Sequence, residues 1–181
     1  MTIYTEVTPN PASLKFVVET ILLPTGTAEF TTPAAAEGKS VLAEKLFVYP
    51  FVTNVFIGRN FVTVTKTDSA RWEDVIPVVK DEIKRVLAEH SVVVAGSDYV
   101  APSAEGDAIV QRIQQIIEEQ VRPAVAMDGG DIVYEGFDEG TVKLRLRGSC
   151  SGCPSSMLTL KAGIEGLLTR MVPEVKAVEA I

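Results

Sequence analysis

The sequence is poor in the residues that bind metals within a single chain: its 181 residues include two cysteines and one histidine. It has no run of about eighteen apolar residues, so we expect no membrane-spanning segment and no membrane partner. Its 17 Lys and Arg against 24 Asp and Glu leave no basic stripe to neutralise phosphates, so we expect no nucleic-acid partner. The hydrophobic share of 46% nevertheless predicts a folded protein with a real core.

The distribution of turn-forming residues predicts two domains. Residues 1–90 and 107–181 each contain their own strand and helix patterns, while residues 91–106 between them include glycine, serine and proline and predict a flexible linker. Cores of roughly 75–90 residues are modest but feasible. We therefore expect an α+β protein with two small α/β domains, each a small sheet packed by helices.

Apolar periodicity locates the elements of the first domain. It predicts strands at 14–19, 52–57 and 61–66 and helices at 40–47 and 72–90. Residues 24–39, with their prolines, glycines and small residues, predict an irregular loop.

The second domain begins with a helical pattern behind the capping residue Asp107. Pro123 predicts a break after that helix, because proline lacks the backbone N–H that a helix interior needs. Strands are predicted at 132–137, 141–147 and 175–181, with a helix between the last two that Pro173 ends.

Cys150 and Cys153 lie three positions apart, between a predicted strand and a predicted helix. At this spacing two thiols can face one point and hold one edge of a metal centre, or they can close a redox disulfide. They cannot complete a metal site, because zinc takes four ligands and an iron–sulfur cluster is usually held by four thiolates. His90 lies far upstream and is not expected to be a ligand. Either the pair is a dithiol for exchange chemistry, or a second copy of the chain supplies the missing thiols.

The residues beside the thiols suit either chemistry. Gly148 and Gly152 allow the backbone to bend sharply and approach a bulky ligand, and Pro154 suits the first position of a helix. A helix N-terminus stabilises thiolates, the form that binds metals and attacks disulfides. The serines that could donate hydrogen bonds to sulfur are Ser151, Ser155 and Ser156.

Two further features near the cysteines each have two interpretations. The string Asp128–Asp131 (DGGD) is favoured as a turn before a strand, although it could also lie beside a metal site and shape access to it. Arg145 and Arg147 are expected to face outward by simple strand alternation. They could also balance the negative charge of a thiolate-bound cluster.

An unsignalled protein with a free CxxC pair suits a reducing compartment, because thiols remain available there. The first residues lack the basic-then-apolar order of a secretory signal and the Arg-rich character of a transit peptide. We therefore expect a cytoplasmic location.

Several strings of this sequence are unusual enough to indicate a family. Those in the second domain are RPAVAMDGGD at 122–131, LRGSCSGCPSS at 146–156 and MVPEV at 171–175. They resemble the C-terminal domain of the NifU family, the Nfu-type iron–sulfur proteins, over about residues 107–181. The strings at 8–16, 42–47 and 55–66 resemble the N-terminal domain of one Nfu subgroup. Together the two resemblances cover nearly the whole chain.

The resemblance implies a scaffold or carrier and not an enzyme. It implies that Cys150 and Cys153 are metal ligands that bind a [4Fe-4S] cluster between two copies, so that the cluster-bound form is a homodimer. It further implies an upstream cluster donor and apo iron–sulfur client proteins as partners. No catalytic residue is implied.

Two other functions stay open on the residues alone. A thiol–disulfide oxidoreductase would also place CxxC at a helix N-terminus, but Ser149 stands where thioredoxins usually have tryptophan. A structural zinc held by two thiolates from each of two chains would use the same ligands.

Overall fold

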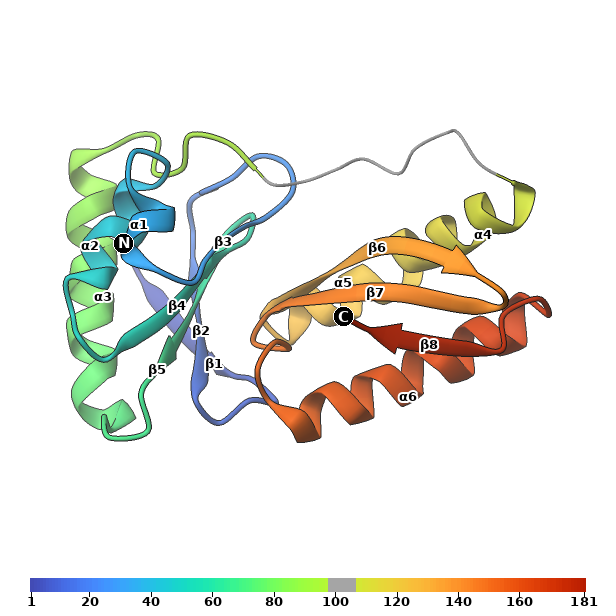
Figure 1. The fold of residues 1–181 in the computed structure, drawn as a ribbon. Coiled ribbons are helices and arrows are strands. Elements are labelled where there is room, and N and C mark those ends of the chain that lie inside the picture. The colour runs from blue at the N-terminus through green and yellow to red at the C-terminus, as the bar shows by residue number, and fades with distance from the viewer. Residues whose placement is uncertain (98–106) are drawn as a thin grey trace. The chain divides into compact units, whose positions relative to one another are not determined.

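The computed structural model describes residues 1–97 and 107–181, which belong to two compact units, Met1–Tyr99 and Val100–Ile181 (Figure 1). Each unit is a sheet covered by helices, so the predicted α+β class is confirmed. The predicted linker at 91–106 lies outside the described residues from position 98 onward, and the predicted domain boundaries stay a prediction. Among the described residues, no helix is both long and apolar enough to cross a bilayer.

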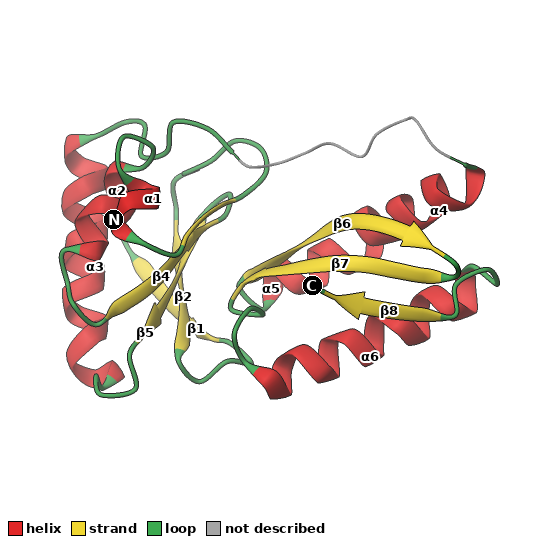
Figure 2. Ribbon diagram, in the orientation of Figure 1, coloured by secondary structure: helices red, strands yellow, loops and turns green. Residues whose placement is uncertain are grey.

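The first unit is an antiparallel five-stranded sheet in the order β1-β2-β5-β4-β3. Its helices lie on one face of the sheet, as Figure 2 shows, and enclose the larger hydrophobic core. The strands are β1 (Ile3–Val7), β2 (Ser13–Val18), β3 (Ala28–Phe30), β4 (Val52–Ile57) and β5 (Phe61–Lys66). The helices are α1 (Pro33–Ala36), α2 (Val41–Phe47) and α3 (Trp72–Glu89).

Ser40 links the start of α2 to the chain that follows α3. Its hydroxyl oxygen accepts a hydrogen bond from the Ala43 N–H at 3.1 Å, which is the side-chain cap expected of serine at this position. The same hydroxyl donates to the carbonyl of Val93 at 2.8 Å, and the Ala95 N–H donates to the carbonyl of Lys39 at 2.7 Å. The chain therefore stays attached to the first unit beyond the end of α3.

The irregular loop predicted at 24–39 is wrong. The segment contains β3, which pairs with β4, and α1, whose N-cap Thr32 accepts from the Ala35 N–H at 3.2 Å. A strand of three residues is too short to show alternation, and a helix of four small residues presents no apolar stripe. Both elements therefore lack the periodic signal on which the prediction relied.

The second unit is a three-stranded sheet in the order β6-β7-β8, in which β6 and β7 are antiparallel and β7 and β8 are parallel. Parallel neighbours need a crossover connection, and α6 supplies it. The elements are α4 (Ala108–Ile116), the π-helical turn η1 (Ile117–Val121), α5 (Arg122–Met127), β6 (Gly130–Asp138), β7 (Thr141–Gly148), α6 (Pro154–Met171) and β8 (Ala177–Ala180). One sheet face shares a core with the helices through residues such as Ile113, Ile132, Val142, Leu144 and Leu168.

Pro123 does not break the helix as predicted. The chain widens into the π turn η1, whose last bond runs from the Arg122 N–H to the carbonyl of Ile117, and it continues as α5 with Pro123 in the first turn. The wider turn lets the helix pass a residue that cannot donate a hydrogen bond.

Candidate metal centre

Two loops of the second unit meet at the cysteines. One is the turn Asp128–Gly129 after α5, and the other is the segment that follows β7 from Ser149 onward. The strand register pairs Gly130 with Gly148 and so brings the loops together. The Ser149 N–H donates to the carbonyl of Gly129 at 3.3 Å, and the Ser149 hydroxyl donates to the carbonyl of Asp128. Ser149 therefore fastens one loop to the other.

Gly130 provides the surface on which Cys150 rests. A Cβ at Gly130 would lie 2.8 Å from the sulfur of Cys150 and 2.6 Å from the carbonyl oxygen of Arg147, so a larger residue would not fit without displacing one of them. The preceding Gly129 has φ of +81°, a conformation that side chains rarely adopt. The DGGD string is therefore a turn at Asp128–Gly129 that leads into β6 at Gly130, as favoured, and it also lies against the cysteine site.

Cys150 is almost fully enclosed, with 4% of its surface exposed, and belongs to the core of the second unit. Burial raises the pKa of its thiol, the contact with the Ser149 hydroxyl lowers it, and the charges of Asp128 and Asp131 raise it. The net direction is upward. The expectation that the helix terminus would favour thiolate at both cysteines is therefore wrong for Cys150, because desolvation outweighs it.

Cys153 is the N-cap of α6, and Pro154 occupies the first helical position as predicted. Its sulfur lies 3.3 Å from the Ser155 hydroxyl. Hydrogen bonds from Ser155 and then Ser156 lower the pKa of the Cys153 thiol to about 7. The two thiols of one motif therefore differ: one is buried and protonated at neutral pH, and the other is half-exposed and partly ionised.

The serines near the thiols are only partly those predicted. Ser155 contacts sulfur, whereas the Ser151 hydroxyl donates to the carbonyl of Gly148 at 2.8 Å. Ser149, 3.8 Å from the sulfur of Cys150, was not predicted. Its immediate proximity to Cys150 in the sequence was the available signal.

The arginines of β7 also differ from each other. Arg145 faces outward as predicted and forms an ion pair with Glu135 at 3.2 Å. Arg147 is only 8% exposed, so the prediction of an outward, solvated residue is wrong at that position. Strand alternation predicts which face of the sheet a side chain lies on, but it does not predict whether other residues cover that face.

Alkylation of the metal-free protein should distinguish the two thiols. Because the thiolate is the reactive form, iodoacetamide at neutral pH should modify Cys153 first. The Cys153 rate should rise with pH and reach half its maximum near pH 7, where about half the thiol is ionised. Cys150 should react only at higher pH. Peptide mass spectrometry over a pH series measures both rates, with Cys153→Ser as the control; equal rates at pH 7 would contradict the assignment.

The thiol pair is open on one side. Gly152, between the cysteines, has φ of +79°, and a Cβ there would meet nothing within 4 Å. Within residues 1–97 and 107–181, no group of three or more His, Cys, Asp or Glu side chains is arranged to hold a metal ion. Two free thiols, with open space at Gly152 between them in the sequence, therefore fit half of a four-thiolate ligand set.

The fold and this loop define a class: α+β proteins of two units with a CxxC loop on the second. Two family models match the chain, a NifU-like domain at residues 113–179 and the N-terminal domain of the scaffold protein Nfu/NifU at residues 3–90. The chain belongs to the Nfu-type, NifU-like family.

Two curated relatives agree with this membership. The human mitochondrial NFU1 iron-sulfur cluster scaffold homolog is 42% identical over 184 residues, which cover 100% of this chain and 72% of the human protein. The mitochondrial NifU-like protein 4 of Arabidopsis thaliana is 42% identical over 99% of this chain and 65% of its own length. A solution structure of a NifU-like protein from Saccharomyces cerevisiae, at 26% identity and a TM-score of 0.49, covers 52% of this chain and 85% of that one.

The relatives correct the expected location. The human protein and NifU-like proteins 4 and 5 of Arabidopsis thaliana are all named as mitochondrial, which points away from the cytoplasm. The cytoplasmic prediction was wrong because it relied on free thiols and on the pattern of the first residues, and neither identifies the compartment. Thiols indicate reducing surroundings, but they do not indicate which compartment supplies them.

Proposed function

We propose that this protein is a scaffold or carrier for iron–sulfur clusters, not an enzyme. It binds a [4Fe-4S] cluster between two copies, with Cys150 and Cys153 of each copy as the four ligands, and hands the cluster to apo-proteins. The observation that carries the proposal is a free thiol pair on an open loop, with no third ligand grouped beside it in the part of the chain that the structure describes. The scaffold names of the relatives support it.

The unlike thiols suit a protein that must both hold and release its cargo. Cys153, half-exposed and partly ionised, is available to take the first bond at neutral pH. Cys150 loses its proton on binding, and its burial against Gly130 keeps water and competing thiols from that side. The open side near Gly152 leaves room for the thiols of a second copy and, on delivery, for those of a client. An upstream donor supplies the cluster by the same route.

Anaerobic reconstitution with iron and sulfide tests this function. We expect a broad brown absorbance near the edge of the visible range, about one [4Fe-4S] cluster per two chains, and recovery of activity when the loaded protein is mixed with an apo [4Fe-4S] enzyme. The matched control is Cys150→Ala/Cys153→Ala, carried through the same procedure. A colourless dimer that contains zinc would favour the structural-zinc function, and a metal-free protein that turns over disulfides would favour the oxidoreductase.

A further inference from the structure

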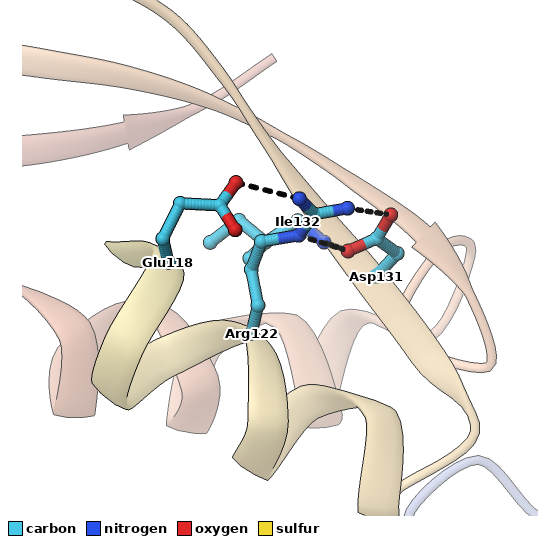
Figure 3. Close-up of polar contacts among 4 residues, drawn as sticks. All are labelled: Glu118, Arg122, Asp131 and Ile132. Atoms are coloured by element: carbon cyan, nitrogen blue, oxygen red, sulfur yellow. Dashed lines mark hydrogen bonds and ion pairs between the residues drawn. The ribbon is translucent and has the colours of Figure 1, made fainter. Parts of the chain in front are cut away.

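Three side chains of the second unit, Glu118, Arg122 and Asp131, form an ion-pair cluster (Figure 3). The guanidinium of Arg122 donates two parallel hydrogen bonds to the carboxylate of Asp131, from Nε to Oδ1 and from Nη2 to Oδ2, each at 2.9 Å. A third bond joins Nη1 to Glu118 at 2.6 Å. The side chains of Arg122 and Asp131 are 16% and 6% exposed. A forked pair of this kind fixes both distance and orientation.

Arg122 lies on the helical segment that faces the start of β6. Glu118 lies one turn earlier within η1, and Arg122 follows directly after the widened turn. Asp131 lies at the start of β6, where its Oδ1 also accepts from the N–H of Ile132 at 2.8 Å. Arg122 therefore ties the helix to the first residues of the strand.

The first residues of β6 also lie against Cys150. Asp131 directly follows Gly130, on which the sulfur of Cys150 rests, and Gly129 accepts the hydrogen bond from Ser149. Contacts thus connect the Arg122 guanidinium through Asp131 and Gly130 to Cys150.

Arg122 and Asp131 also affect the thiol site through their charges. The carboxylate of Asp131 lies close enough for its charge to act on Cys150. Left without a partner, a buried carboxylate is costly, and it would also repel thiolates and an anionic cargo. Burial opposes ionisation of Arg122, but the hydrogen bonds and charges of Asp131 and Glu118 outweigh it and raise its pKa, so Arg122 stays a cation.

We propose that Arg122 is a positioning residue for the thiol site: through Asp131 it holds the segment Asp128–Asp131 against Cys150, and it neutralises the Asp131 carboxylate. The consequence for cluster retention rests on the proposed function. The effect on the loops does not, because it concerns the metal-free protein.

Hydrogen exchange of the metal-free, full-length protein tests the positioning directly. In Arg122→Gln, backbone amides of residues 129–132 and 149–151 should exchange roughly tenfold faster or more, while those of β7 and β8 beyond the loop keep their protection. The matched control is Arg145→Gln, which removes an exposed ion pair from the same sheet and should change neither segment. Arg122→Lys keeps the charge but loses the two parallel hydrogen bonds, so its exchange rates should lie between those of the wild type and Arg122→Gln. Asp131→Asn serves as a second probe of the pair if Arg122→Gln does not fold.

Cluster retention is the second readout. Reconstituted Arg122→Gln should lose iron to a chelator several-fold faster than the wild type and Arg145→Gln, with partial rescue in Arg122→Lys. Unchanged exchange at 149–151, or an equal loss of protection throughout the second unit, would overturn the positioning role. A wild-type protein that takes up no cluster would refute the proposed function and leave the exchange result to decide the role of Arg122.

Discussion

Replacing either cysteine with alanine should abolish stable cluster retention. In the proposed function each copy contributes two thiolates, so Cys150→Ala or Cys153→Ala would leave two ligands where a [4Fe-4S] cluster usually has four. We expect iron and sulfide per dimer to fall from about one full cluster to background after removal of unbound metal. The two variants should fail equally, although their thiols differ in burial, because the ligand count and not the exposure decides retention.

The control separates ligand loss from damage to the fold. Cys150 is in the core, so its alanine variant should melt at a lower temperature, whereas Cys153 is at a helix end and its variant should melt much like the wild type. Ser151→Ala, between the two thiols, should retain its cluster. A full cluster per dimer in either single cysteine variant would show that the ligand assignment is wrong.

Cluster binding and dimerisation should be one linked equilibrium. If half of the ligand set lies on each chain, anything that binds only the dimer stabilises it by mass action, by about 2.7 kcal/mol at a hundredfold excess over Kd. In the described part of the second unit, the exposed large apolar residues are few: Met127, Leu158 and Ile181. A stable interface usually buries at least about 1,200 Å². The metal-free protein should therefore be monomeric at low concentration and become a dimer on reconstitution.

Sedimentation velocity of dilute samples measures this switch. The reconstituted protein should sediment as a dimer, and chelation or oxidation of the cluster should return it to the monomer. A tight metal-free dimer would contradict the switch alone.

The positions of the elements around the site could largely be predicted, because each carries a local signal. The alternation of β7, the proline at the start of α6 and the glycines of the two loops all lie in the sequence where the structure uses them. Strands and helices of this length show their own period, and the turn residues mark their ends.

The properties of the site depend on contacts that no local pattern encodes. Cys150 and Cys153 occupy one motif, yet only Cys150 is enclosed, because Gly130 from another strand lies against it. Arg122, which pairs with Asp131, directly follows a π turn at the place where the sequence predicted a helix break. Both the burial of Cys150 and the Arg122–Asp131 pair come from tertiary packing, and the sequence identifies only the residues involved.

The central claim is one cluster shared by two chains, and native mass spectrometry of the anaerobically reconstituted protein tests it most directly. The proposed function predicts a species with the mass of two chains plus one [4Fe-4S] cluster, together with metal-free single chains. Mixing the wild type with a mass-tagged copy during reconstitution should yield cluster-bound dimers that contain one of each. A single chain that carries a complete cluster would contradict the claim.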